Sequence, residues 1–150
     1  NNSIKDNSVL TIFEKLTNIG FFKFNEATKT TNDYIKKLDI KVSNIDSFVM
    51  NLSGGNQQKV VIAKWLAKNC RVLLFDEPTR GIDVAAKAQI WKLISKFTKE
   101  GGSVIVASNE IPELINNCNR IITMQKGLIS NTFKYEDFNE QKISLNISSK

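Results

Sequence analysis

The sequence predicts an α/β protein in which a small helical region precedes a mostly parallel sheet flanked by helices. Helical and strand-like segments alternate through the second half of the chain, which is typical of α/β folds. The strand-like segments are short continuous apolar runs, which is typical of strands buried on both faces of a parallel sheet. The length of 150 residues is enough for about one domain.

The first 52 residues are predicted to form the helical region. Asn1 to Ser8 are polar and are expected to be a tail. Apolar residues then recur with helical spacing from Val9 to Ile19, and Gly20 ends this predicted helix. The polar residues 25–31 indicate turns, so we expect the second helix to centre on residues 34–38.

The remaining elements follow in alternation after a glycine pair at positions 54 and 55. A strongly apolar, well-buried helix comes first, and the last residues are expected to be a mobile polar tail. The predicted domain organisation is a helical subdomain at 1–52, a core at 53–135 and the tail at 136–150. The expected elements are helices at 56–68, 85–98 and 112–117 and strands at 72–75, 104–107, 120–124 and 128–133, the last two around a Lys126-Gly127 turn.

Composition excludes several classes of protein. The chain has no histidine, which excludes a Ser-His-Asp triad, a Cys-His dyad and metal sites that need imidazole. Its two cysteines, Cys70 and Cys118, are too few for a disulfide framework or a four-cysteine metal cluster. No apolar run reaches the roughly 18 residues that span a bilayer, so a reducing, cytosolic compartment is expected. The net charge of +6 is interpreted as a solvated lysine-rich surface, with a nucleic-acid surface as the alternative.

The segment Leu52–Lys59 has the features of a phosphate-binding turn. Gly54 and Gly55 allow backbone amides to approach a ligand, and they precede a predicted helix whose free N–H groups favour an anion. Ser53 adds a hydroxyl. The alternative is an ordinary N-capped helix after a glycine turn, because serine is a common N-cap.

Two adjacent carboxylates, Asp76 and Glu77, directly follow the predicted strand at 72–75. The carboxyl end of such a strand is where α/β folds bind ligands. An aspartate there could hold Mg²⁺ through water, and the neighbouring glutamate could polarise a water for attack on a phosphoryl group. The alternative is a plain strand end with acidic loop residues, and this pattern alone does not separate the two.

Taken together, in this order and spacing, the segments resemble the nucleotide-binding domain of ABC-type ATPases. Leu52–Lys59 matches the family's signature motif, usually written L-S-G-G-Q, and Val72–Glu77 matches its Walker B strand. Gly81–Asp83 lies where the family has its D-loop, and residues 104–110 lie where it has the switch strand and loop.

This resemblance implies a partial P-loop NTPase-like fold and an ATP hydrolase that uses ATP and Mg²⁺. It also implies a role for each matching residue. These are Glu77 as the catalytic residue, Asp76 as the Mg²⁺ residue acting through water, Asp83 in the D-loop, Asn109 at the switch position, and Ser53, Gly54, Gly55 and Gln57 in the ATP-binding signature.

The amino-acid sequences of two segments, Asn56–Val60 and Asp76–Val84, are similar to those of one branch of the family. That branch is the ATPase subunit of bacterial monosaccharide importers for galactosides, ribose or xylose, in which two ABC domains are fused in one polypeptide. The sequences of these two segments are typical of the second of the two fused domains. The implied partners are the N-terminal ABC domain, membrane permease subunits facing residues 1–52 and, indirectly, a periplasmic or surface sugar-binding protein, with no nucleic acid. The implied location is peripheral, on the cytoplasmic face of the inner membrane.

Two features depart from the family pattern. None of the seven glycines is followed by lysine, so the Walker A phosphate loop is missing. We therefore expect the chain to be the C-terminal part of a domain and to be inactive alone. Asn109 stands where the family usually has a histidine, as is common in the second domain of fused importers. The signature residues would then act in trans on ATP held by the N-terminal domain, while the Walker B carboxylates and Asn109 would serve a second, weaker site.

Three other functions are compatible with the same residues. One is an ABC ATPase lobe of a DNA-repair or chromosome-maintenance protein, although no heptads flank the domain and arginines are few. Another is a nucleoside importer rather than a sugar importer. The last is a non-catalytic regulatory module that kept the fold, against which stand the intact Asp76 and Glu77.

Overall fold

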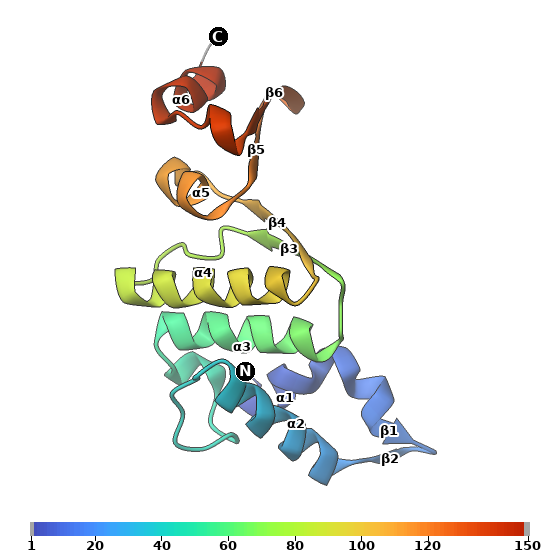
Figure 1. Ribbon diagram of the computed structural model, residues 1–150. Coiled ribbons are helices and arrows are strands. Elements are labelled where there is room, and N and C mark those ends of the chain that lie inside the picture. Colours follow the sequence, from blue (N-terminus) through green and yellow to red (C-terminus); the bar gives the residue numbers. More distant parts are fainter. Residues whose placement is uncertain (1, 149–150) are drawn as a thin grey trace. The chain divides into compact units, whose positions relative to one another are not determined.

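The structure is a computed structural model that describes residues 2–148. It divides into two compact units, Asn1–Ile105 and Val106–Lys150, and each is described by itself. The domain boundaries predicted at 52/53 and 135/136 remain a prediction. The elements lie in the order labelled in Figure 1.

The first unit is mainly helical. Near its start, two strands of two residues each form a small antiparallel hairpin. The first strand of a second sheet follows later in the unit. Its elements are α1 (Ile4–Val9), the 3₁₀ helix η1 (Leu10–Leu16), β1 (Thr17–Asn18), β2 (Phe21–Phe22), α2 (Phe24–Lys37), η2 (Val49–Asn51), α3 (Gly54–Ala67), β3 (Val72–Asp76) and α4 (Val84–Lys99), and β4 (Ser103–Ala107) crosses the boundary between the units.

Helix α3 is the centre of the first unit, because α1, α2 and α4 all pack against it (Figure 1). One apolar cluster joins α1 and η1 to α2 and to the end of α3. Phe22 of the small antiparallel hairpin β1–β2 and Tyr34 of α2 pack on its edge. The buried members of the cluster are Val9, Ile12, Leu16, Ala27 and Ala67.

The predicted N-terminal tail is wrong for the residues that the structure describes. Ser3 is the N-cap of α1, and its side chain accepts a hydrogen bond from the Asp6 amide. Ile4 is fully buried. The predicted helix from Val9 to Ile19 is also shorter, because the chain tightens into η1 and then turns at Ile19-Gly20 to form the β1–β2 hairpin. A short helix whose buried apolar side chains, Ile4 and Val9, lie only at its two ends gives little periodic signal.

Residues 25–31 form the first half of α2 rather than turns. Ala27 and Thr31 are buried one turn apart, and the Thr31 hydroxyl donates to the Ala27 carbonyl oxygen at 2.9 Å. This bond satisfies the buried hydroxyl inside the helix, so a threonine can occupy a core position there. Polarity alone therefore misidentified a buried helical face.

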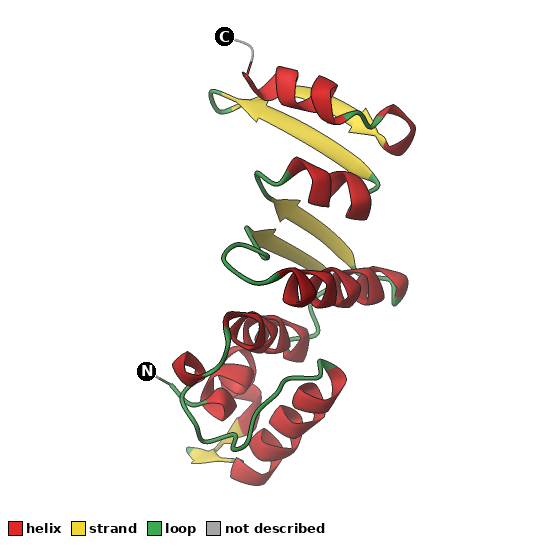
Figure 2. Cartoon of the chain, turned by 90° about the vertical axis from the view of Figure 1, so that its left-hand side faces the viewer, coloured by secondary structure: helices red, strands yellow, loops and turns green. Residues whose placement is uncertain are grey.

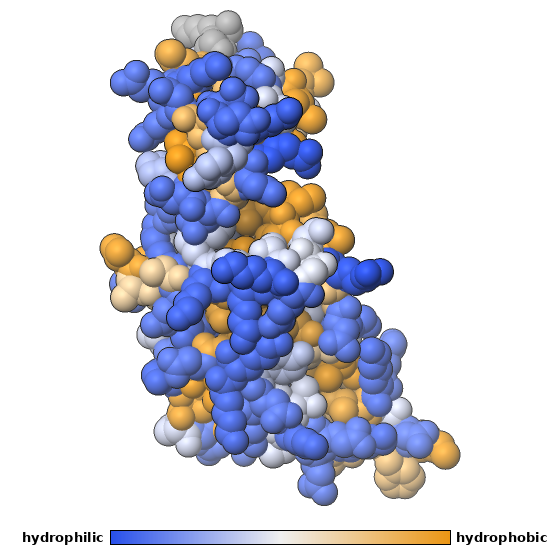
Figure 3. Space-filling model, viewed as in Figure 1, coloured by the Kyte–Doolittle hydropathy of each residue, from blue (hydrophilic) through white to orange (hydrophobic). Residues whose placement is uncertain are grey.

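The strands β3 and β4 pair with each other, with α4 between them in sequence (Figure 2). They were expected to be buried on both faces, and this is wrong in the structure. Leu73 is buried, whereas Leu74 is 74% exposed, and Val72 and Ile105 are also exposed. On the face shown in Figure 3, hydrophobic residues, in orange, lie among hydrophilic residues in several places.

The second unit is built on a hairpin. Strands β5 (Arg120–Gln125) and β6 (Leu128–Lys134) are antiparallel, as the predicted two-residue turn between them requires. Helix α5 (Ile111–Asn117) precedes them, and η3 (Tyr135–Asp137) and α6 (Glu140–Ser148) follow. The described residues of the predicted tail are thus largely helical, because Ile143 of α6 packs on Ile121 and Phe133 and is only 1% exposed.

Candidate functional site

The signature segment lies at the start of α3. Ser53 is the N-cap residue with φ −59° and ψ 153°, but its side chain makes no capping hydrogen bond. The first amides of a helix have no acceptor within the helix, so those of Gly54 and Gly55 are left for another partner. Ser53 and Gly54 are exposed. Gly55 is buried. The structure therefore presents the Ser53 hydroxyl and the Gly54 amide at an exposed helix end, where an oxyanion can accept hydrogen bonds from them.

Asn56 connects this helix end to the loop that follows α2. Its Oδ1 accepts a hydrogen bond from the Lys41 amide at 2.9 Å, and its Nδ2 donates to Ser53 Oγ at 3.0 Å. The backbone amide can only donate, so the two contacts fix which end of the side-chain amide faces the serine. Asn56 was not selected from the sequence. Counting along L-S-G-G-Q would have found it, because Asn56 occupies the fifth position of the motif and Gln57 the sixth.

Gln57, which was selected, turns back on the segment before the helix. Its Nε2 donates to the Leu52 carbonyl oxygen at 2.8 Å and to that of Met50 at 3.4 Å. Its side chain is half-buried. These contacts fix the entry of the chain into α3, and a role of Gln57 toward ATP remains a proposal.

The two signature glycines bring α3 close to the D-loop and to the start of α4. A Cβ atom on Gly55 would lie 2.6 Å from Ala86 Cβ, and one on Gly54 would lie 3.2 Å from Ile82 Cγ2. Neither glycine has a positive φ, so their small size is what the structure uses here. The sequence analysis connected these glycines only to ligand approach. The structure adds a packing role and brings together two of the predicted motifs.

Lys59 anchors the same helix one turn further along. It is only 4% exposed, and its Nζ donates to the Asp39 carbonyl oxygen at 2.8 Å, at the end of α2. Burial lowers the pKa of Lys59, while the negative charge of Asp39 opposes this shift. On the surface of the same turn, the hydrogen bond and charge of Lys41 lower the pKa of the exposed Asp39 carboxyl. The turn at 39–41 therefore holds α3 through both Asn56 and Lys59.

The Walker B carboxylates lie where β3 ends. Asp76 is the last residue of the strand and is exposed. Glu77 has a φ of +48°, which is uncommon for a residue with a side chain, so the strand ends sharply there. The Arg80 amide donates to the Glu77 carbonyl oxygen at 3.2 Å and closes the turn, whose buried residues are Pro78 and Thr79.

This end of β3 fits a magnesium ion held mainly by water. Mg²⁺ commonly takes one or two protein carboxylates and keeps several waters. Asp76 and Glu77 provide two adjacent carboxylates, and within residues 2–148 no group of three or more carboxylate, cysteine or histidine side chains could hold a metal ion. Two adjacent carboxylates are donors that such an ion can use, and the role of Asp76 through water remains a prediction.

Asp83 of the D-loop has a structural partner. It is the N-cap of α4, and its side chain accepts a hydrogen bond from the Ala86 amide at 2.9 Å. Asn109, in the second unit, follows β4 and is exposed; its carbonyl oxygen accepts from the Ile111 amide at 3.2 Å. The structure therefore places the D-loop beside the signature glycines and Asn109 at the expected position after the strand.

Comparison with known proteins decides the family. The ABC transporter family matches residues 2–80, which is more than half of the chain. The chain belongs to the ABC transporter family. The resemblance of the sequence to ABC-type ATPases is therefore confirmed for the family. Membership of this family implies a nucleotide-binding protein.

Individual relatives of this ABC chain are sugar import proteins. It is 43% identical over 141 residues to the ribose import ATP-binding protein RbsA 2 of Mesorhizobium japonicum, covering 94% of the chain and 28% of that protein. It is 42% identical to the xylose import ATP-binding protein XylG of Thermoanaerobacter pseudethanolicus, covering 93% and 28%. The ABC chain thus spans little more than a quarter of the length of these relatives.

Solved structures confirm the α/β fold class. The ATP-binding cassette MJ0796, in a dimeric post-hydrolysis state bound to ADP and Pi, superposes with a TM-score of 0.73 at 26% identity. The match covers 91% of this ABC chain and 58% of that cassette. No helix within residues 2–148 is long and apolar enough to cross a membrane.

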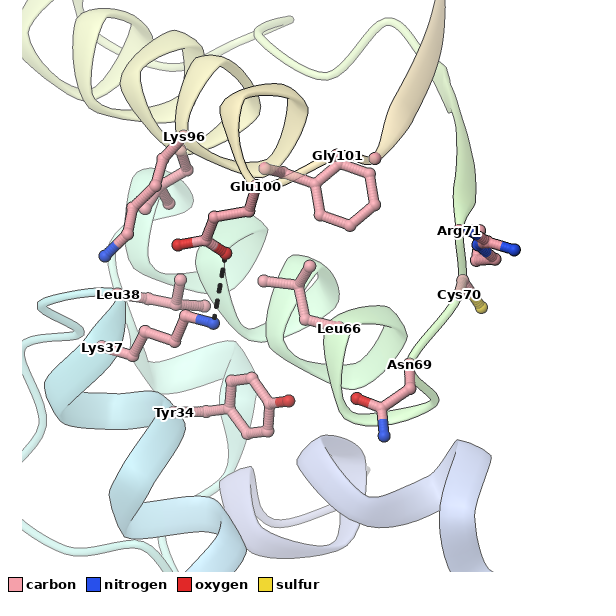
Figure 4. Close-up of a pocket in the computed structure, with 13 residues that line it drawn as sticks. Tyr34, Lys37, Leu38, Leu66, Asn69, Cys70, Arg71, Lys96, Glu100 and Gly101 are labelled. Carbon is pink, nitrogen blue, oxygen red and sulfur yellow. Dashed lines mark ion pairs between the residues drawn. The ribbon is translucent and has the colours of Figure 1, made fainter.

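A cavity lies at the other end of α3 from the signature segment (Figure 4). This cavity of about 380 Å³ is bounded by α2, the end of α3 and the end of α4. An ion pair at 3.9 Å between Lys37 Nζ and Glu100 Oε2 joins α2 to the residue that ends α4. Tyr34 also lines the hollow, and its burial raises the pKa of its hydroxyl. About 12 residues of α3, or roughly 18 Å, separate this cavity from the signature segment.

Proposed function

We propose that this chain is part of the ATP-binding subunit of an ABC transporter that couples ATP binding and hydrolysis to monosaccharide import, with ribose or a galactoside as the substrate. One observation carries the proposal. The signature segment forms an uncapped helix start with an exposed serine, in a chain about 43% identical to a ribose import ATP-binding protein.

The signature end of α3 would complete an ATP site in trans. The terminal phosphate of ATP carries negative charge on oxygens that accept hydrogen bonds. The Ser53 hydroxyl and the first amides of α3 are hydrogen-bond donors at the positive end of the α3 dipole. They would stabilise the γ-phosphate of a nucleotide whose phosphate loop belongs to the N-terminal ABC domain, with Gln57 holding the loop before the helix.

The end of β3 would serve the second, weaker site. Glu77 would act as general base on the attacking water, and Asp76 would hold Mg²⁺ through water. When bound, the ion neutralises charge that builds on the phosphate oxygens. Asn109 can donate a hydrogen bond to the γ-phosphate but carries no charge, so its site would stabilise the transition state less well than a histidine would. Asp83 would keep the D-loop in place by capping α4.

The proposed partners follow from this assignment. They are the N-terminal ABC domain of the same polypeptide and membrane permease subunits, with a sugar-binding protein outside the membrane acting indirectly. The location would be peripheral, on the cytoplasmic face of the membrane. The sugar import relatives support the transporter over a DNA-maintenance ATPase.

The test compares two substitutions in the full-length polypeptide assembled with its permease. Ser53→Arg places a bulky cation at the exposed start of α3, and we expect it to abolish nearly all sugar-stimulated ATPase activity. Glu77→Gln removes a base of the weaker site and should cost much less. Ser95→Arg, at an exposed position of α4, is the matched control and should leave activity unchanged.

The outcome separates the two sites. Equal losses from Ser53→Arg and Glu77→Gln would contradict the proposed division of labour. Full activity of Ser53→Arg would contradict the role of the signature segment altogether.

A further inference from the structure

We propose that Asn56 is a positioning residue that orients the Ser53 hydroxyl as a hydrogen-bond donor toward the γ-phosphate of ATP. The inference rests on the proposed function, in which the signature segment completes an ATP site. It assigns a role to a side chain through the two hydrogen bonds that the structure gives it.

The first step concerns the orientation of the Asn56 amide. The Lys41 amide donates to Asn56 Oδ1 at 2.9 Å, which leaves Nδ2 to face Ser53 Oγ at 3.0 Å. A flipped side chain would set two donors against each other at Lys41, so the flipped state is unfavourable. Lys59, held by the Asp39 carbonyl oxygen, keeps the same turn against α3.

The second step concerns the hydrogen of the serine hydroxyl. Nδ2 has only hydrogens to offer, so Ser53 Oγ must accept in this contact. The hydroxyl hydrogen is then directed to another acceptor, and within residues 2–148 the structure gives it none. Ser53 is exposed at the helix start, where the α3 dipole attracts an anion. A phosphate oxygen arriving there meets a donor whose rotation is already restricted by the contact with Asn56, so less entropy is lost on binding.

The test uses Asn56→Asp in the full-length polypeptide. Aspartate keeps the size and the oxygen that accepts from Lys41, but its second oxygen would accept the Ser53 hydrogen and withdraw it from the phosphate. Losing a hydrogen bond to a charged group corresponds to roughly a tenfold to hundredfold loss of affinity. We therefore expect the Kd for the non-hydrolysable analogue AMP-PNP to rise at least tenfold and the Kd for ADP to stay within twofold.

Two controls distinguish positioning from loss of structure and from added charge. Asn44→Asp makes the same chemical change at an exposed loop asparagine whose Oδ1 also accepts a backbone amide, from Asp46 at 2.9 Å. It should leave both affinities unchanged. Asn56→Leu adds no charge; it should weaken AMP-PNP binding severalfold in the wild type and not at all in a Ser53→Ala background, where there is no hydroxyl to orient.

Each result has one meaning. Asn56 does not act through Ser53, and the inference is overturned, in either of two cases. One is that Asn56→Asp weakens the binding of AMP-PNP and of ADP equally. The other is that the effects of Asn56→Leu and Ser53→Ala on AMP-PNP affinity are additive. If Ser53→Ala itself leaves AMP-PNP affinity unchanged, the proposed function of the signature segment fails. If Ser53→Ala lowers the AMP-PNP affinity and Asn56→Asp does not, only the positioning role of Asn56 is overturned.

Discussion

Replacing Gly55 with alanine should destabilise the first unit, although alanine is the better helix former. The new Cβ would lie 2.6 Å from Ala86 Cβ, whereas carbon atoms in contact prefer about 3.5 to 4.0 Å. Ala86 carries its Cβ directly on the α4 backbone, so the overlap of roughly 1 Å is relieved only by moving one helix. Overpacking of this kind costs about 1–3 kcal/mol, and the helix propensity of alanine returns at most about 1 kcal/mol. We expect a net loss of about 1–2 kcal/mol.

The assay is urea unfolding followed by tryptophan fluorescence. Both tryptophans, Trp65 of α3 and Trp91 of α4, belong to the first unit, so their signal reports the helices in question. Gly54→Ala is the matched control. Its Cβ would meet Ile82 Cγ2 at 3.2 Å, and that flexible side chain can give way, so the change should stay within about 0.5 kcal/mol.

A compensating substitution makes the reasoning refutable. Ala86→Gly removes the atom that Gly55→Ala would strike, at an intrinsic cost of about 1 kcal/mol in a helix. The double variant should be more stable than the sum of the two single changes predicts, with a coupling of about 1–2 kcal/mol. A Gly55→Ala protein as stable as the wild type, or an additive double variant, would refute the packing role of Gly55.

Three further predictions follow from named contacts. Gly102→Ala should lose about 1–3 kcal/mol of stability in urea unfolding, because the new Cβ would lie 2.2 Å from the Phe97 ring. Adding Phe97→Leu to this variant should recover part of the loss, and no recovery would contradict the clash. Asp83→Ala should cost about 1 kcal/mol through the lost N-cap of α4, whereas Asp83→Asn should stay near the wild type, and equal losses would show that the cap is unimportant. Burial lowers the pKa of Lys59, so on raising the pH the folded state releases this proton before the unfolded state does. The free energy of unfolding of the wild type, relative to that of Lys59→Met, should therefore rise as the pH approaches about 10.4. A difference that does not change with pH would contradict the burial effect.

Elements with strong periodicity were predictable from the sequence, and elements held by one or two contacts were not. Helix α4 and strand β3 lie within one or two residues of their predicted positions. Helix α1 was missed because its buried contacts come from Ile4 and Val9 at its two ends. The first half of α2 was missed because its buried face uses Ala27 and Thr31, whose small or polar side chains do not register as a hydrophobic pattern.

Burial of the strands was the least predictable property. An apolar run indicates that both faces of a strand can be covered, but not which elements cover them. Leu73 is buried and Leu74 is exposed, although the two leucines are equivalent in sequence. Their difference depends on tertiary partners, and the sequence pattern of a strand carries no information about these.

The position of each candidate site residue along the elements was predictable, but its hydrogen bonds were not. The sequence predicted a helix from residue 56 and a strand ending at residue 75. The structure begins α3 two residues earlier, at Gly54 with Ser53 as its N-cap, and extends β3 by one residue to Asp76. That Ser53 accepts a bond from Asn56 rather than capping the helix depends on where the Lys41 amide lies, 15 residues away along the chain. Contacts of this range are set by the packing of α2 on α3 and not by local sequence.

The packing of the signature glycines has a consequence for how the proposed ATP site would communicate. Closely packed atoms transmit displacement because little free space remains to absorb it. Gly55 leaves no room for even a methyl group against Ala86, and the Asp83 side chain holds the Ala86 amide at 2.9 Å. Movement of the α3 start toward a bound phosphate would therefore pull or push the D-loop and the start of α4 with it. In the proposed ATP site the glycines would admit the nucleotide and, by the same lack of side chains, would link the two motifs mechanically.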